Sequence, residues 1–161
     1  MSLKERSARR ITTSMMALSG AGLFVVFLLE DVVGRDAAQW SDMPWALILR
    51  YEAAMTLGGA IAGFLLSGLF GRRGLRGWPL ALLGGVMAST LAGLFGSAVG
   101  LIPDILSGGW DQGDLVSIAS GLAILPLTLI GHPLLFLLWL LLLILTHVWA
   151  RRTRSTPVPE A

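Results

Sequence analysis

The chain has 161 residues, of which 55% are hydrophobic and only 14% are charged, whereas about 25% of the residues of a soluble domain are charged. With a mean hydropathy of +0.75, this composition excludes an ordinary soluble domain and predicts an integral membrane protein. The pI near 9.9 does not indicate nucleic-acid binding, because the basic residues lie in short clusters beside apolar runs, where membrane orientation signals belong.

The first ten residues are basic, and a long apolar segment follows over residues 11–33. This segment is longer than the core of a signal peptide and ends in Glu30 and Asp31, so we expect it to remain as a first spanning helix. Residues 45–70 and 78–102 form two further apolar segments. Each is longer than the roughly 20 residues that a spanning helix needs.

The last apolar region, residues 115–149, is too long for one helix perpendicular to a hydrocarbon core about 30 Å thick. Pro126 and Pro133 each remove a backbone donor and are expected to break it. We therefore predict a short interfacial or re-entrant helix over about residues 115–125, with Asp114 as its N-cap, and then a fourth span that begins at about Pro126 or Pro133 and ends at Trp149. Because the final leucine-rich run does not alternate with polar residues as barrel strands do, the sequence predicts an all-α polytopic fold with four transmembrane helices.

Ten of the twelve Lys and Arg residues lie in residues 1–10, 71–77 and 151–161, whereas the other two loops contain only Arg35 beside several aspartates. Since cytoplasmic loops of membrane proteins are enriched in Lys and Arg, we expect these three segments inside and the acidic loops outside. The prediction is a basic cytoplasmic tail, a four-helix transmembrane domain over residues 11–150, and a basic, proline-containing cytoplasmic tail. The expected location is a bacterial-type inner membrane. A fifth span is the alternative, but it would place the C-terminal arginines outside.

Small residues recur at helical spacing on the second and third apolar segments. Gly59 and Gly63 form a small-xxx-small pair, which lets two helix backbones approach closely. The third segment carries a corresponding series of Gly85, Ser89, Gly93, Gly96 and Gly100. Because the connecting loop is short, we expect the two segments to be antiparallel neighbours that pack through these faces. The same faces are also candidates for self-association or for docking to a larger complex.

Arg50 and Glu52 lie within the second apolar segment, where ionisable residues are rare and costly. Their side chains point about 200° apart on a helix. Glu52 is therefore expected to face the glycine groove, with the hydroxyl of Thr56 or Ser89 as a hydrogen-bond partner, while Arg50 faces elsewhere.

Arg50 lies close to the outer end of its segment, where its long side chain can reach the interface. Glu30 and Asp31 end the first segment on the same side of the membrane. We therefore expect one of these two carboxylates to be the charge partner of Arg50 at the outer interface.

His132 lies between Gly131 and Pro133 at a predicted helix break. There it is expected to hydrogen-bond carbonyl groups that the break leaves free, or to change its protonation near neutral pH. His147 is expected only to anchor the last span at the inner interface. Neither histidine has a second one at ligand spacing, so no metal site is predicted, and no motif indicates a cofactor.

The pattern contains no enzyme motif, since residues 96–100 do not fit the G-x-S-x-G nucleophile elbow. We expect a non-enzymatic accessory or scaffolding subunit of a larger inner-membrane complex, which contacts the lipid bilayer and either other membrane subunits or a second copy of itself. The alternative is a small oligomeric transporter or channel in which Glu52, Arg50 and His132 line a polar path.

Overall fold

The computed structural model describes residues 3–33 and 43–155, and over these ranges the chain is all-α, as predicted. Its helices are α1 (Leu3–Val33), α2 (Trp45–Leu65), the short 3₁₀ helix η2 (Ser67–Leu69), α3 (Gly77–Gly108), α4 (Gln112–Gly131) and α5 (Pro133–Ser155). The four long helices α1, α2, α3 and α5 correspond in order to the four apolar segments of the sequence.

The first and last helices extend beyond the apolar segments into the basic ends of the chain. α1 begins at Leu3, so Arg6, Arg9 and Arg10 lie in its first turns, and α5 continues to Ser155. Leu, Lys, Glu, Arg and Ala all favour helix formation, so the charged residues prolong α1 rather than end it. The first basic segment is therefore helical from Leu3 onward, and the last one is helical up to Ser155; residues 156–161 lie outside the described part.

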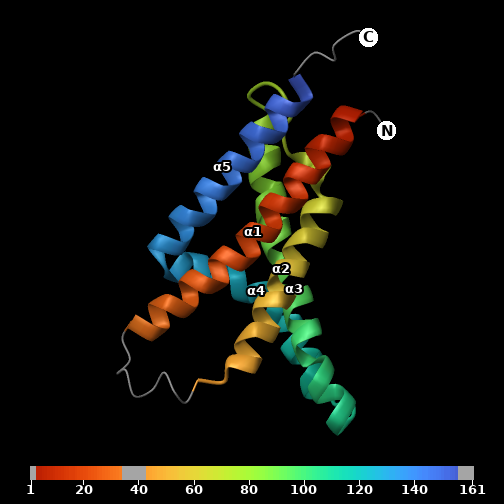
Figure 1. The fold of residues 1–161 in the computed structure, drawn as a ribbon, viewed down its shortest axis with the longest axis vertical. Coiled ribbons are helices and arrows are strands. Elements are labelled where there is room, and N and C mark those ends of the chain that lie inside the picture. Colours follow the sequence, from red (N-terminus) through yellow and green to blue (C-terminus); the bar gives the residue numbers. More distant parts are fainter. Residues whose placement is uncertain (1–2, 34–42, 156–161) are drawn as a thin grey trace.

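The helices form a bundle in which neighbours in sequence are mostly neighbours in space (Figure 1). α1 packs against α2 and α5, while α3 packs against α2 and α4. The start of α1, the end of α5 and the connection between α2 and α3 lie at one end of the molecule, at the top of Figure 1. We call it the basic end, because the arginine clusters lie there. The opposite end, where α3 ends and α4 begins, carries Asp104, Asp111 and Asp114 and is called the acidic end.

The break before the last helix lies at His132 and not at Pro126. α4 runs through Pro126 to Gly131, His132 is extended with φ −125° and ψ 98°, and α5 begins at Pro133. A proline disfavours the helical conformation of the residue before it, which explains why the chain leaves the helix at His132. The helix before the break is consequently longer than the expected residues 115–125.

α4 begins with a capping box made by Asp111 and Asp114. The Asp111 side chain accepts hydrogen bonds from the backbone N–H groups of Gly113 and Asp114, and Asp114 Oδ2 accepts one from the Asp111 N–H at 2.9 Å. The prediction that Asp114 is the N-cap is therefore wrong. Asp114 instead occupies the third helical position, from which the reciprocal bond of a capping box is made.

Small residues fill much of the interior, whereas many large apolar side chains face outward. Alanines of α2 and α3, such as Ala62 and Ala81, are fully buried. Exposed large apolar residues occur on every long helix and include Leu18, Leu49, Leu57, Leu82, Leu106, Val116, Ile130, Leu134 and Leu141. Such a distribution is unusual for a soluble monomer, which exposes few large contiguous apolar patches.

Two of the described helices, α3 and α5, are long and apolar enough to cross a membrane. Their most apolar stretches have mean hydropathies of 1.7 and 2.2, and only 33% and 39% of those stretches are buried. A core helix of a soluble protein would be mostly buried. The described parts of α1 and α2 do not meet the same criterion, and α2 contains Arg50 and Glu52.

Candidate functional site

The glycine pair of α2 contacts α1 rather than α3. A Cβ atom added at Gly59 would overlap the Met16 carbonyl oxygen, and one at Gly63 would lie 2.7 Å from the Thr12 carbonyl oxygen. α2 and α3 are neighbours, as expected, but the prediction that Gly59 and Gly63 join them is wrong. The backbone of α1 occupies the space in front of this face.

The glycines of α3 contact three different helices and not one. Gly85 lies against Leu143 of α5, Gly93 against Gly121 of α4, Gly96 against Met55 of α2, and Gly100 against Tyr51 of α2. The glycine of α2 that faces α3 is Gly58, where a Cβ atom would lie 2.8 Å from the Ala92 carbonyl oxygen. The sequence analysis did not single out Gly58, although the Gly58-Gly59 doublet was a signal that α2 is approached from two sides.

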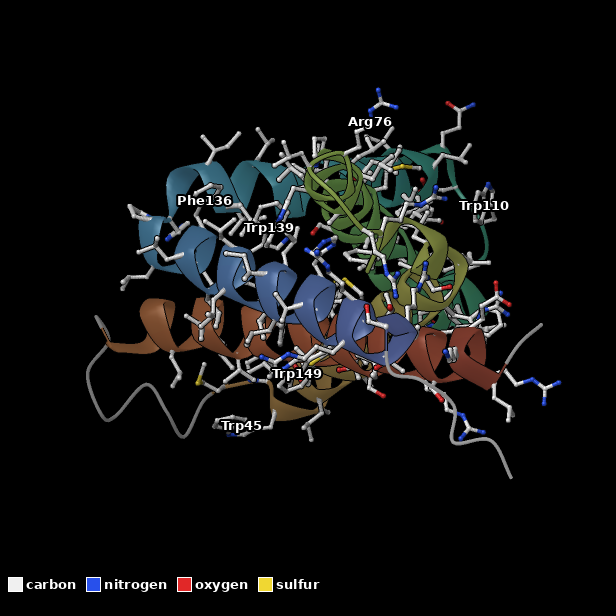
Figure 2. All side chains as sticks on the ribbon, turned by 90° about the horizontal axis from the view of Figure 1, so that it is seen from above. Trp45, Arg76, Trp110, Phe136, Trp139 and Trp149 are labelled. Carbon is white, nitrogen blue, oxygen red and sulfur yellow. The ribbon has the colours of Figure 1, made fainter. Side chains whose placement is uncertain are left out.

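Ser89 connects α3 to α5 and is not a partner of Glu52. Its Oγ accepts a hydrogen bond from Trp139 Nε1 at 2.9 Å, and both residues are buried. Figure 2 shows Trp139 within the bundle, whereas Trp45 and Trp110 lie at the periphery. The indole N–H, which needs a partner when buried, thereby finds one on a neighbouring helix.

Arg50 forms an ion pair between α2 and α3. Its Nη2 atom lies 3.2 Å from Asp104 Oδ2, and the guanidinium also lies 5.6 Å from the centre of the Tyr51 ring. The side chains of Glu30 and Asp31 lie outside those described, so their pairing with Arg50 stays a prediction. Because Asp104 is 61% exposed, its ion pair with Arg50 contributes at most about 1 kcal/mol of stability.

Glu52 lies on the same helical face as Thr56 and Gly59, the face that contacts α1. The Thr56 side chain lies beside the Glu52 carboxyl group, on the same face of α2. The second carboxyl oxygen, Oε2, is buried and makes no hydrogen bond to the described residues. A buried acceptor without a partner is uncommon in folded proteins and marks Glu52 as a candidate functional residue.

His132 contributes its backbone to the break between α4 and α5. Its N–H donates to the Thr128 carbonyl oxygen at 3.0 Å, and its carbonyl oxygen accepts from the Phe136 N–H at 3.0 Å. Both backbone groups at the break are thus satisfied by the adjacent helical turns, so the break leaves no orphaned group at this residue.

His147 is buried in the bundle and does more than anchor the last helix. Its Nδ1 accepts a hydrogen bond from the Gly71 N–H at 3.2 Å, and its ring centre lies 4.6 Å from that of Trp78. Gly71 has a φ of +72°, which glycine adopts readily. His147 therefore attaches the turn after η2 to α5. The hydrogen bond joins residues 76 positions apart, and no local spacing in the sequence indicates it.

The three polar candidates Arg50, Glu52 and His132 occupy separate places. Arg50 pairs with α3, Glu52 lies on the α1 side of α2, and His132 lies at the α4–α5 break. Between the helices is a cavity of about 160 Å³, whose lining comes from all five α-helices and includes Phe24, Tyr51, Ser97, Leu129 and Leu135. Within the described part of the chain, none of the three candidates lines this mainly apolar cavity.

Residues 3–33 and 43–155 contain no group of three or more His, Asp or Glu side chains placed to hold a metal ion. Comparisons of the chain with protein-family models, curated proteins and solved structures find no match.

Proposed function

We propose that the protein crosses a bacterial-type inner membrane four times, through α1, α2, α3 and α5, with both termini in the cytoplasm. α3 and α5 have the length and composition of spans, and α1 packs along α2 and α5. At the basic end, Arg154 Nη2 donates to the Ser67 carbonyl oxygen at 3.0 Å, and Arg9 lies over the Phe64 ring. These contacts join the basic ends of α1 and α5 to the end of α2 and to η2, and the positive-inside rule supports a cytoplasmic place for that end.

Within this proposal, α4 is the interfacial or re-entrant helix. It begins at the acidic end and packs against α3, and α5 continues from its other end toward the basic end (Figure 1). The outer side of α4 is apolar, with Val116, Leu127 and Ile130 exposed by 70%, 64% and 81%. Because exposing this much apolar surface to water is unfavourable, lipid or another protein is expected to cover it.

We propose further that the molecule is a non-enzymatic accessory or scaffolding subunit of a larger inner-membrane complex. The observation that carries this proposal is the outer side of α4, which the described part of the chain leaves exposed. The glycine faces are occupied within the chain. The contact with another membrane subunit is therefore proposed at α4 and not at Gly59 or Gly63.

Purification of the full chain in mild detergent tests this proposal. A partner membrane protein should copurify in stoichiometric amount, and Leu127→Gln should reduce its recovery, whereas Leu82→Gln on the exposed side of α3 should not. A homogeneous preparation of this chain alone, unchanged by Leu127→Gln, would contradict the accessory role and favour the alternative below.

The alternative is a small oligomeric transporter or channel, and the buried, unpartnered Oε2 atom of Glu52 is the observation that favours it. Under this hypothesis Glu52 exchanges a proton or cation with the cargo, so Glu52→Gln should abolish ion flux in proteoliposomes while the protein remains folded. Arg50→Gln is the comparison variant, since it changes the net charge by one unit in the opposite direction and breaks only a weak ion pair. If the wild type itself carries no flux, the transporter hypothesis is wrong.

A further inference from the structure

A pocket lined mostly by basic and hydroxyl-bearing residues lies between α1 and α2 at the basic end of the molecule. It has a volume of about 320 Å³ and is lined by Arg6, Arg9, Arg10, Thr13, Ser14 and Phe64. The five residues from α1 recur one helical turn apart, since Arg9 and Arg10 follow Arg6 by three and four positions and Thr13 and Ser14 follow Arg10 by three and four, which places them on one side of that helix. Phe64, near the end of α2, forms the apolar part of the wall.

Phe64 holds Arg9 in place within this pocket. The Arg9 guanidinium carbon lies 4.6 Å from the centre of the Phe64 ring, a distance at which a cation is attracted to an aromatic face. The contact restricts the orientation of a long side chain before any ligand binds. An ordered guanidinium loses less conformational entropy on binding than one that moves freely in solvent.

Two buried polar atoms of the pocket make no hydrogen bond to the described residues, namely Arg9 Nε and Thr13 Oγ1. The neighbouring Thr12 differs, because its hydroxyl donates to the Ala8 carbonyl oxygen at 2.9 Å, one turn back in the helix. A threonine hydroxyl on α1 is therefore able to donate to a carbonyl oxygen of its own helix, but the Thr13 hydroxyl does not. Leaving a buried donor without a partner is unfavourable, and neither atom would lose an existing hydrogen bond on turning toward a ligand.

The charges of the pocket define the ligand that fits it. Arg9 and Arg10 follow Arg6 by three and four positions, so both like charges lie one helical turn from the Arg6 guanidinium and repel it, and Glu5, four positions before Arg9, is the acidic residue in this turn. Guanidinium groups bind phosphate oxygens through several charge-assisted hydrogen bonds, and a threonine hydroxyl adds a further donor. Basic pockets at the cytoplasmic side of membrane helices are suited to anionic lipid head groups.

We propose that this pocket binds a phosphate group, with Arg9 and Thr13 donating hydrogen bonds to its oxygens. The phosphate belongs either to the head group of an anionic phospholipid or to a soluble phosphate compound. Phe64 is partly exposed beside the arginines and offers an apolar contact for the glycerol and acyl part of a lipid. The lipid source depends on the proposed membrane location, whereas the phosphate site itself does not.

The test measures binding to the full chain in a non-ionic detergent by native mass spectrometry and by the shift in melting temperature. The lipid probes are phosphatidylglycerol and, as a control without phosphate, diacylglycerol. The soluble probes are glycerol 3-phosphate and inorganic phosphate, each tested separately. Arg9→Gln, which removes the charge and shortens the side chain, and Thr13→Val, which nearly preserves the side-chain volume, are each expected to weaken phosphatidylglycerol binding by about tenfold. Arg73→Gln is the matched control, since Arg73 is exposed at the same end but does not line the pocket.

Loss of phosphatidylglycerol binding in the two pocket variants but not in Arg73→Gln supports the site. If the soluble phosphate compounds bind with the same dependence on Arg9 and Thr13, the source is a soluble phosphate; if they do not bind, it is a lipid. Equal binding of phosphatidylglycerol by all three variants, equal binding of diacylglycerol, or no binding of any phosphate compound overturns the proposal. None of these outcomes depends on whether a partner subunit copurifies.

Discussion

Replacing Gly59 with leucine is expected to separate α1 from α2 and to destabilise the whole bundle. The Cβ atom of the new side chain would overlap the Met16 carbonyl oxygen. This oxygen belongs to the backbone of α1, which cannot relieve the overlap by changing a rotamer as a side chain could. Overpacking costs about 1–3 kcal/mol where neighbours can adjust, so we expect at least about 3 kcal/mol here. Each kcal/mol lowers the melting temperature by about 2–4 °C in a chain of this size, which gives a fall of at least about 6 °C. The measurement is a thermal melt in detergent, followed by gel filtration to assess the assembly state.

Gly22→Leu on α1 is the matched control, because a Cβ atom there meets nothing within 4 Å. This variant should melt at the wild-type temperature or slightly above it, since leucine favours a helix more than glycine by up to about 1 kcal/mol. Wild-type melting and assembly for Gly59→Leu would show that α1 and α2 do not pack as closely as described.

Replacing His147 with leucine is expected to destabilise the attachment of the α2–α3 connection to α5. The leucine removes the acceptor of the buried Gly71 N–H and the ring that contacts Trp78. A buried donor left without a partner costs about 1–3 kcal/mol. A comparison of the melting temperatures of the variant and the wild type in the same detergent measures this loss.

His147→Asn separates the hydrogen bond from the packing. An asparagine carbonyl oxygen occupies nearly the position of the histidine Nδ1 atom and is able to accept from the Gly71 N–H, although it does not replace the ring. The asparagine variant should therefore recover part of the stability that leucine loses. Equal melting temperatures for the two variants would mean that the hydrogen bond contributes nothing measurable.

The helices were predictable from long apolar runs, but their ends were not. Hydrophobicity marks the part of a helix suited to lipid, and α1 continues past that part because Lys4, Glu5 and Arg6 are also good helix formers. At the start of α4, two aspartates compete for the N-cap, and only the reciprocal hydrogen bonds between Asp111 and Asp114 distinguish them. The sequence offered two places for the break, Pro126 and Pro133. The structure has it at His132, directly before Pro133, while α4 continues through Pro126.

The candidate site was predictable only in its residue types. Helical spacing shows that Gly59 and Gly63 share a face, but it does not show that α1 covers that face. Arg50 was recognised as an ion-pair residue, whereas Asp104, its partner 54 positions away, was not, because the pairing depends on how far α3 extends. The pocket at Arg9 requires α2 to end beside the first turns of α1, which no periodicity in either segment reveals.

The most direct test of the proposed topology uses the absence of cysteine from the chain. Single cysteines introduced at Ser7, Ser107 and Ser155 are treated with a membrane-impermeant thiol reagent in spheroplasts, before and after the membrane is opened. The four-span proposal predicts that the cysteine at position 107 is labelled in intact spheroplasts, and that those at positions 7 and 155 are labelled only after opening. Labelling of position 155 in intact spheroplasts would place α5 in the opposite direction and contradict the four-span topology.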